Sequence, residues 1–541
     1  PGPGPGTRPA QTLLPEEKWA EVVQANLETV RFYKRLGFDG IDLRCDRDLL
    51  PTPDGRNLAD RTRFVRSFLE AVREKLDNGF LIHGTIAWEQ PLGYRGRKPG
   101  QPGYTAADAA EFLRLTEGVV DIMELRENSI ASSHPTGYTM EEGVHPVLAF
   151  CEQVKKDGCR TKLEAIGGSQ DPNEMEAALQ AGVCDFIGAA RAFMADGSYG
   201  KKLFEGRDGD IVPCLLCNRC HGTILPEHEP WLSVCSVNPR MGKDAKLGRM
   251  LDGLGRTGKK VAVIGGGPAG MRAALYAAEQ GHTVTLYEKS DRLGGQLFHS
   301  DYFSFKWPIR RYKDWLIRQL ENHGVRIVLN TAPSPETIEA GGYDAVIAAT
   351  GASPALPRSI EGLYDESGWV KKDVLTCLDG IRQEARLGKK LLIIGGSEVG
   401  METAMFLCEK GHDVTVLTRQ KELGHNCSKL HYVTMAFLRR MPDGSVREAA
   451  AWERYENLHG ITEAETLRVK DGQVTYRTAD GAEHTIEGDS VLICGGMEKR
   501  IDEAMGYAGT APQYFAIGDC VGAGNIQKCT AQAFAAVMNI L

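Results

Sequence analysis

The 541-residue sequence lacks the marks of several classes of protein. No apolar run approaches the roughly 18 residues that a membrane-spanning helix needs. The first ten residues, PGPGPGTRPA, lack the apolar core of a signal peptide. No long block of Lys and Arg is present and the net charge is −8, so we expect no nucleic-acid partner. The 14 cysteines are too few for a disulfide scaffold in a chain of this length.

The composition is that of a folded protein, with 42% hydrophobic and 25% charged residues. At roughly 150 residues per domain, the length predicts about three to four domains. Glycine is abundant, with 62 residues, or about 11% against a usual ~7%. Such an excess indicates places where the backbone turns tightly or comes close to a ligand.

Four cysteines stand apart from the others, which lie singly in apolar surroundings. Cys214, Cys217 and Cys220 follow one another in PCLLCNRCHG, and Cys235 comes shortly afterwards in WLSVCSVNP. Four thiolates at this spacing can bind a [4Fe–4S] cluster. Four cysteines can also hold a structural zinc ion, and a third interpretation involves no metal. The spacing favours the cluster and leaves the other two open.

The first glycine-rich turn lies in residues 259–290, KKVAVIGGGPAGMRAALYAAEQGHTVTLYEKS. A buried strand runs into Gly265, Gly267 and Gly270, a helix follows, and a second strand ends at Glu288. Strand, G-x-G-x-x-G turn, helix, strand and acid together form a dinucleotide-binding fingerprint. The glycines let a pyrophosphate approach the helix N-terminus, and the acid can accept a hydrogen bond from a ribose hydroxyl.

A second unit of the same kind begins at Lys389, in KKLLIIGGSEVGMETAMFLCEKGHDVTVLTRQ. Gly395, Gly396 and Gly400 occupy its turn, and Glu402 follows in the helix. Where the ribose acid would stand, this unit carries Arg419 in place of a carboxylate. That exchange slightly favours the 2′-phosphate of NADP over NAD, although a surface arginine is the alternative. The two turns indicate two nucleotide sites.

The first 200 residues alternate helical and extended segments, which predicts a parallel α/β architecture. The expected strands, each preceded by a helix, are 38–43, 80–88, 119–125, 161–168 and 184–191. The last two end in small residues, which suits the phosphate site that a (β/α)8 barrel places after its final strands. The candidate phosphate contacts are Gly167, Gly168, Ala190 and Arg191, and Arg191 could instead be a surface ion-pair partner.

Two further stretches resemble the remaining fingerprints of flavoprotein reductases with two dinucleotide domains. They are YDAVIAATGASP (residues 343–354) and YFAIGDCVGAGN (residues 514–525). The resemblance implies that the first unit binds FAD and that the second, inserted unit binds NADH or NADPH. It adds to the candidate FAD contacts Ala269, Gln296, Thr350, Gly351 and Asp519.

The order of these motifs resembles the iron–sulfur branch of the old yellow enzyme family. That family includes 2,4-dienoyl-CoA reductase, 2-enoate reductase and trimethylamine dehydrogenase. The resemblance implies a TIM barrel with FMN, a [4Fe–4S] loop and two Rossmann-like domains, in the α/β class. It favours the cluster over zinc at the four cysteines. It also implies an NAD(P)H-dependent reduction of an activated C=C bond, with electrons passing from NAD(P)H to FAD, to the cluster and to FMN.

The resemblance divides the chain into five segments. Residues 1–205 form a partial FMN-binding barrel, 206–256 the cluster segment and linker, 257–385 the first part of the FAD domain, 386–488 the inserted NAD(P)H domain, and 489–541 the return segment of the FAD domain. A complete barrel needs eight strands, and the sequence supplies those that match strands four to eight. We therefore expect further barrel strands before Pro1.

The residues expected at the catalytic face depart from the family. Arg44 and Arg47 stand where members of the family carry a His or Tyr and a His. An arginine stays protonated near neutral pH, so this pair could bind a carboxylate but could not donate a proton. A structural or solvent-facing pair is the alternative. The candidate proton donors are His134 and Tyr138, in a loop expected at the same face.

Two other functions stay open at this point. The chain could be an amine dehydrogenase or N-demethylase, which would reverse the electron flow. It could also be an electron-transfer subunit whose barrel has lost its catalytic role. An oxygen-sensitive cluster and the absence of targeting signals favour a cytoplasmic location. We expect a small-molecule substrate, and an anionic group on that substrate would suit Arg44 and Arg47. The sequence is also compatible with a homo-oligomer.

Overall fold

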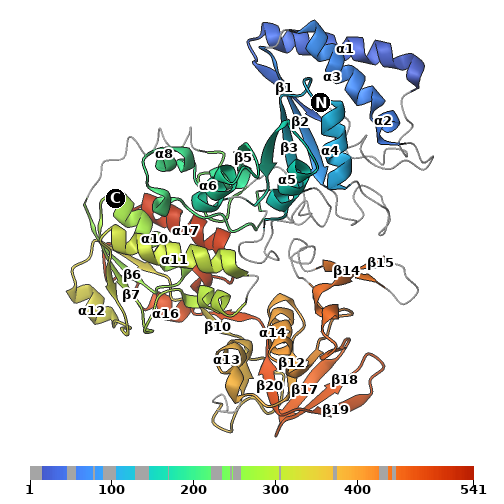
Figure 1. Ribbon diagram of the computed structural model, residues 1–541. Coiled ribbons are helices and arrows are strands. Elements are labelled where there is room, and N and C mark those ends of the chain that lie inside the picture. The colour runs from blue at the N-terminus through green and yellow to red at the C-terminus, as the bar shows by residue number, and fades with distance from the viewer. Residues whose placement is uncertain are drawn as a thin grey trace. The chain divides into compact units, whose positions relative to one another are not determined.

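The computed structural model describes residues 15–45, 57–76, 79–88, 105–127, 145–168, 170–217, 219–220, 234–243, 247, 258–303, 306–368, 374–425, 436–440 and 446–541. These residues fall into two compact units (Figure 1). The N-terminal unit runs to Ala189, and the C-terminal unit runs from Ala190 to Leu541.

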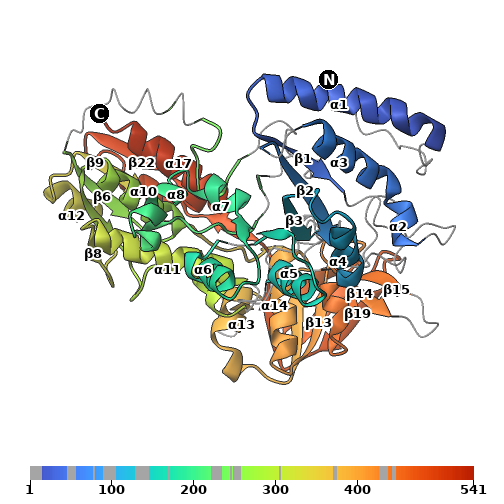
Figure 2. The same cartoon turned by 45° about the horizontal axis from the view of Figure 1, so that its top comes forward.

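The N-terminal unit contains one parallel sheet of five strands in the order β1-β2-β3-β4-β5. The strands are β1 (Gly40–Arg44), β2 (Leu81–Trp88), β3 (Ile122–Glu127), β4 (Lys162–Ile166) and β5 (Phe186–Gly188). The helices between and before them are α1 (Trp19–Arg35), α2 (Leu58–Arg61), α3 (Arg63–Lys75), α4 (Ala106–Leu115), α5 (Pro146–Lys156) and α6 (Pro172–Gln180). The predicted alternation of helix and strand is confirmed. Both views show α1 beside α3 and α4 beside α5 (Figures 1 and 2).

The two faces of this sheet differ because successive side chains of a strand point to opposite sides. One face carries Ile82, Ile86, Met123, Leu125 and Leu163, which are fully buried and belong to one core with residues of the helices. The other face is polar in four of the five strands. It carries Asp42 and Arg44 of β1, His83 and Thr85 of β2, Glu124 and Arg126 of β3, and Glu164 of β4.

The C-terminal unit begins with two short helices, α7 (Ala190–Ala195) and α8 (Tyr199–Phe204). Its first sheet is parallel, in the order β22-β9-β6-β7-β8. The strands are β6 (Lys260–Ile264), β7 (Thr283–Tyr287), β8 (Arg326–Val328), β9 (Ala345–Ala348) and β22 (Gln513–Ala516). The helices are α10 (Pro268–Glu279), α11 (Trp307–Asn322), α12 (Pro335–Ala340), α16 (Ile501–Met505) and α17 (Ile526–Met538), and α10 lies against α17 (Figure 1). Strand β9 is buried along its whole length, as expected of a central parallel strand.

A second parallel sheet forms from chain that leaves the first sheet after β9 and returns at β22. Its order is β11-β20-β12-β13-β16. The strands are β11 (Leu375–Thr376), β12 (Lys390–Ile394), β13 (Asp413–Leu417), β16 (Leu458–Ile461) and β20 (Ser490–Ile493), with helices α13 (Cys377–Arg382) and α14 (Glu398–Glu409). The antiparallel elements are β10 (Ala352–Pro354) with β21 (Met497–Lys499), β14 (Ala436–Arg440) with β15 (Val446–Ala450), and β17 (Glu465–Lys470), β18 (Gln473–Arg477) and β19 (Glu483–Glu487).

The boundaries 386 and 488, expected for the inserted unit, both fall inside the region that builds this second sheet. Strand β11 lies before residue 386 and β20 lies after residue 488, yet β20 pairs with β11 and with β12. With only two residues, β11 is too short to be recognised as a strand from the sequence. This explains why the expected boundary at residue 386 lies after it. Among the described residues, no helix combines the length and the apolar character needed to cross a bilayer.

Candidate functional site

The first glycine-rich turn joins β6 to α10 in a conformation that excludes side chains. Gly265 has a φ of 110°, and a Cβ atom there would lie 2.3 Å from the carbonyl oxygen of Ala349. A Cβ atom on Gly270 would lie 1.8 Å from the carbonyl oxygen of Gly265. Gly267 is the N-cap residue of α10. The strand therefore passes directly into the helix, whose free N–H groups can face a phosphate.

Glu288 comes directly after β7 and faces this turn. Its side chain is buried, with 8% of the residue exposed. Oε2 accepts a hydrogen bond from the backbone N–H of Gly266 at 2.7 Å. Oε1 accepts hydrogen bonds from the N–H and the hydroxyl of Ser290, at 2.8 and 2.6 Å. The carboxylate is thus held in place by the turn, and Oε2, which accepts one hydrogen bond, keeps a second lone pair for a ligand.

A cavity of about 520 Å³, which we call the β6 cavity, lies over this turn. The predicted FAD contacts that line it are Gly265, Gly267, Ala269, Glu288, Gln296, Thr350, Gly351 and Asp519. Asp519 lies in a short 3-10 helix after β22, and its Oδ1 accepts a hydrogen bond from the N–H of Gly524 at 3.0 Å. Burial raises the pKa of the Asp519 carboxyl. A helix N-terminus, an anchored acid and a glycine cradle fit a dinucleotide.

The second turn joins β12 to α14 and repeats the geometry of the first. Gly395 has a φ of 114°, and a Cβ atom on Gly400 would again lie 1.8 Å from the carbonyl oxygen of the first glycine. Gly395, Gly396 and Arg419 line a cavity of about 300 Å³, the β12 cavity. The same cradle with an arginine at its rim fits a nucleotide that carries a phosphate on its ribose.

Glu402 does not line the β12 cavity. It lies on α14, is 3% exposed, and accepts a hydrogen bond from Lys306 Nζ at 2.5 Å. Lys306 comes directly before α11 of the first sheet. The structure therefore places Glu402 in an ion pair between the two parallel-sheet regions, and its role at the second nucleotide stays a prediction.

The four cysteines of the predicted cluster line one small cavity, the thiol cavity, together with Arg191 and Met194. The N–H of Leu216 donates to Cys214 Sγ at 3.3 Å, and Cys217 Sγ lies 3.2 Å from Ser236 Oγ. Burial raises the pKa of the Cys214 thiol to about 12 and that of Cys235 to about 11. Such thiols become thiolates when a metal takes the place of the proton. Convergence of four thiols fits the [4Fe–4S] cluster and equally the tetrahedral zinc alternative.

Arg191, a predicted contact of a flavin phosphate, lines the thiol cavity. Its charge there favours the thiolate of Cys214. Ala190 begins α7 in the same unit. Gly167 and Gly168 follow β4 in the N-terminal unit and both have positive φ, 146° and 71°. The role of Arg191, Gly167 and Gly168 at a phosphate stays a prediction.

A larger cavity of about 600 Å³, the junction cavity, adjoins the other three. It shares Cys217 and Ser236 with the thiol cavity, Gln296 and Asp519 with the β6 cavity, and Ser397 with the β12 cavity. Glu402 and Lys306 also line it. The residues predicted for the cluster and for both nucleotides therefore meet around one space.

His299 lines the junction cavity and carried no signal in the sequence, because no motif includes it. It is 8% exposed, and its Nδ1 lies 3.0 Å from the carbonyl oxygen of Gln296. Nδ1 therefore carries the proton, and Nε2 has no hydrogen-bond partner in the described part of the chain. Burial lowers the pKa of His299 to about 4. The imidazole is therefore neutral at pH 7, with Nε2 as its acceptor atom.

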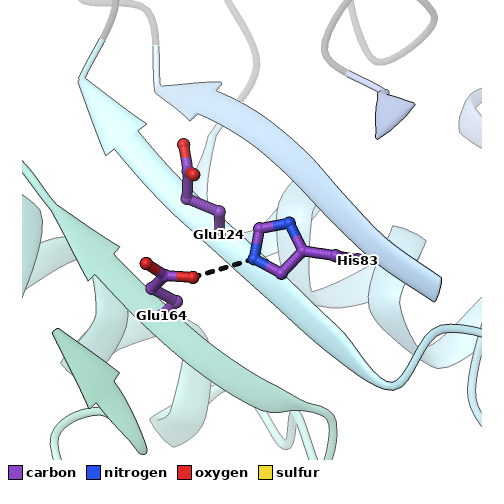
Figure 3. A group of neighbouring side chains, drawn as sticks. All are labelled: His83, Glu124 and Glu164. Atoms are coloured by element: carbon purple, nitrogen blue, oxygen red, sulfur yellow. Dashed lines mark hydrogen bonds and ion pairs between the residues drawn. The ribbon is translucent and has the colours of Figure 1, made fainter. Parts of the chain in front are cut away.

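In the N-terminal unit, Arg44 ends β1 and is exposed on the polar face of the sheet. Arg47, His134 and Tyr138 lie outside the described residues. His83 is on the polar face, and each of its ring nitrogens lies against a carboxylate. Figure 3 shows the contact with Glu164. Its Nε2 lies 2.8 Å from Glu164 Oε2, and its Nδ1 lies 3.0 Å from Asp42 Oδ1. Chiefly through the bond to Glu164, these contacts raise the pKa of His83 to about 9.

Comparison with known proteins gives one family and a set of oxidoreductases. The profile of the family described as pyridine nucleotide-disulphide oxidoreductase matches residues 259–536. An NADH oxidase of Thermoanaerobacter brockii is 31% identical over 76% of this chain and 63% of its own length. A cinnamate reductase of Clostridium sporogenes is 29% identical over 76% of this chain and 62% of its own length. The chain thus spans less than two thirds of either relative.

A solved structure of 2-naphthoyl-CoA reductase in complex with 2-naphthoyl-CoA has the same fold. The match covers 99% of this chain and 79% of that one, with a TM-score of 0.82 and 24% sequence identity. At that identity the likeness concerns the fold alone. It supports the α/β architecture with parallel sheets that the sequence predicts.

Proposed function

The chain belongs to the pyridine nucleotide-disulphide oxidoreductase family, and on that premise we propose that it is part of an NAD(P)H-dependent iron–sulfur flavoenzyme that reduces an activated C=C bond. The resemblance to the iron–sulfur branch of the old yellow enzyme family is confirmed by relatives such as the cinnamate reductase. In the proposal, electrons pass from NAD(P)H to FAD, to a [4Fe–4S] cluster and to FMN. The substrate is a 2-enoate, an enoyl-CoA or an enone.

The observation that carries the proposal is the junction cavity. Its walls include Cys217 of the cysteine set, Asp519 of the proposed FAD site and Ser397 beside the second glycine turn. A bound FAD accepts a hydride from a nicotinamide, and a [4Fe–4S] cluster carries single electrons. A chain that transfers electrons between such groups needs their binding residues around a common space, which these residues provide.

In this proposal the residues of the chain bind and orient the cofactors and the substrate. The N–H groups at the start of α10 face the pyrophosphate of FAD, and Glu288 accepts from a ribose hydroxyl. Arg419 pairs with the 2′-phosphate of NADPH. The neutral Nε2 of His299 accepts a hydrogen bond from the group that enters the junction cavity. Arg44 and Arg47 bind the anionic part of the alkene substrate.

Anaerobic titration of the purified chain with NADH and with NADPH tests the direction of electron flow. We expect either coenzyme to bleach the flavin absorption and a 2-enoate to restore it when FMN is present. If an N-methyl amine bleaches the flavin while neither coenzyme does, the ene-reductase proposal is wrong and the amine dehydrogenase is right. Acid extraction that yields FAD without FMN would favour the electron-transfer subunit.

A metal analysis tests the cluster separately. We expect four irons per chain, lost in a Cys217→Ala variant. The matched control is Cys408→Ala, since Cys408 is a buried free cysteine on α14, away from the thiol cavity. Zinc in place of iron, without broad visible absorption, would contradict the cluster and leave the nucleotide sites untouched.

A further inference from the structure

Three side chains with metal-binding chemistry meet on the polar face of the N-terminal sheet. They are His83 of β2, Glu124 of β3 and Glu164 of β4, which are neighbouring strands (Figure 3). Glu124 and Glu164 are direct partners in the register of β3 and β4. His83 lies two residues before Thr85, which is the partner of Glu124. The alternation of side chains along the strands therefore puts all three on one face.

The ligand atoms are close enough to share one ion. One atom of each side chain lies within 4.8 Å of the corresponding atoms of the other two, and His83 Nε2 is 2.8 Å from Glu164 Oε2. A metal about 2.0–2.1 Å from each ligand requires ligand atoms roughly 3.3 Å apart in a tetrahedron. The three side chains therefore place their ligand atoms near the separation that a shared metal ion needs.

The residues around these three hold them as a metal site needs. Asp42 Oδ1 accepts from His83 Nδ1 at 3.0 Å and from the Thr85 hydroxyl at 3.0 Å. A carboxylate on one imidazole nitrogen fixes the tautomer and aims the other nitrogen at a metal. Arg126 donates to Glu124 Oε1, and hydrogen bonds of this kind commonly hold ligating carboxylates. The hydrogen bonds of Asp42 and Arg126 are a second observation, separate from the short distances between the three ligand atoms.

The charges of the group also favour a dication. Asp42, Glu124 and Glu164 supply three negative charges, and Glu124 is only 6% exposed. His83 and Arg126 lie against these carboxylates, and Arg44 lies on the same face at the end of β1. A divalent cation that displaces the Nε2 proton of His83 adds one positive charge next to the carboxylates, and the proton goes to solvent. Like charges directly opposite one another in a sheet are otherwise destabilising.

We propose that His83, Glu124 and Glu164 bind a divalent first-row cation, with Asp42 and Arg126 as the residues that orient the ligands. One imidazole and two carboxylates suit Mn²⁺, Fe²⁺, Co²⁺ or Zn²⁺ better than Mg²⁺ or Ca²⁺, which prefer oxygen alone. The site lies within the N-terminal unit and includes none of the four cysteines of the thiol cavity. It does not depend on the proposed function.

Binding of Mn²⁺ to the full chain tests the proposal, because Mn²⁺ prefers oxygen and nitrogen ligands and binds thiolates poorly. The protein is treated with EDTA, desalted without nucleotide and titrated with MnCl₂ while the EPR signal of free Mn²⁺ is recorded. We expect about one Mn²⁺ bound per chain. Electron spin echo modulation of the bound ion should show a ¹⁴N coupling from the imidazole of His83.

Three variants probe the residues in turn. His83→Ala should abolish the ¹⁴N coupling and weaken Mn²⁺ binding by more than about 100-fold, and Glu164→Gln should weaken it by a similar factor. Asp42→Asn changes an orienting residue and should cost about 10–100-fold. The control is Glu174→Gln, because His145 and Glu174 form another His–Glu pair in the same unit, at 3.1 Å, outside the three-ligand group.

Circular dichroism of each variant checks that it folds. The ¹⁴N coupling is measured on the wild-type chain, so this part of the test does not depend on the folding of any variant. Absence of Mn²⁺ binding overturns the proposal. So does bound Mn²⁺ without the ¹⁴N coupling, or binding that is equal in wild type and His83→Ala. A loss in Glu174→Gln as large as that in Glu164→Gln also overturns it.

Discussion

The two glycine turns permit a matched pair of substitutions that separates the two nucleotide sites. A Cβ atom at Gly270 would lie 1.8 Å from the carbonyl oxygen of Gly265, and one at Gly400 would lie 1.8 Å from that of Gly395. Since Cβ contacts under 3.0 Å are essentially never seen, alanine at either position must move a backbone segment by about 1.2 Å. The obstacle in each case is a carbonyl group of the main chain, which cannot rotate away as a side chain would.

Overpacking of this kind typically costs about 1–3 kcal/mol. If that cost falls on the turn that holds the ligand, affinity drops by roughly 5-fold to 150-fold, at 1.4 kcal/mol per factor of ten. We therefore expect Gly270→Ala to lower the affinity for FAD by this factor. Gly400→Ala should retain FAD and lower the affinity for NAD(P)H by the same factor.

The assay measures FAD content after gel filtration, the Kd of FAD on the deflavinated chain, and the Kd of NAD(P)H on the FAD-loaded chain. Gly197→Ala is the control, because a Cβ atom there meets no atom within 4 Å. If Gly270→Ala binds FAD as the wild type does, or if Gly400→Ala alone loses FAD, the assignment of the two turns is refuted. Equal losses of both ligands in both variants would refute it as well.

Three further predictions concern charged residues. Lys306→Met should lower the unfolding free energy by about 3 kcal/mol, because it leaves Glu402 buried without its cation. The double variant Lys306→Met/Glu402→Leu should recover most of that loss in urea denaturation, and a double variant less stable than the single one contradicts the argument. Arg419→Ser should weaken NADPH binding about tenfold and leave NADH unchanged, as measured by Kd, whereas equal effects on both would assign Arg419 to the surface. In metal-free protein the pKa of His83 is raised to about 9 above an unfolded value of about 6.5. Its contribution to stability is full below pH 6.5 and is lost as pH rises through 9. Thermal unfolding in EDTA at pH 6 and pH 10 should therefore show a larger fall in Tm for wild type than for His83→Gln, and identical falls would contradict the shift.

The sequence predicted those parts of the structure that depend on local geometry. The turns at Gly265 and Gly395 were predictable because a strand that passes directly into a helix needs glycine at fixed spacings. The five helix–strand pairs were predictable from periodicity alone. The convergence of the cysteines followed from their spacing.

Positions that depend on register between distant segments were not predictable. Glu402 stands two residues beyond a nucleotide turn, but its direction is decided by Lys306, almost a hundred positions earlier in the chain. Arg191 follows a strand end, yet it lines the thiol cavity. His299 became a candidate only when its surroundings in space were known. The metal-site proposal likewise depends on three strands whose residues meet only through pairing, since no stretch of sequence contains His83 and Glu164 together.

The similarity of the two turns means that a glycine motif alone does not identify its ligand. Gly265 and Gly395 have φ values of 110° and 114°, and a Cβ atom added to Gly270 or to Gly400 would lie 1.8 Å from the carbonyl oxygen of the respective first glycine. A turn so closely repeated cannot distinguish one dinucleotide from another. The difference lies at the end of the following strand, where Glu288 is anchored by the N–H of Gly266 while Thr418 and Arg419 border the β12 cavity. A carboxylate there accepts from a ribose hydroxyl and repels a phosphate, whereas a guanidinium attracts one. We therefore expect these strand-end residues to determine the choice of ligand, so exchanging them should change coenzyme preference without disturbing either turn.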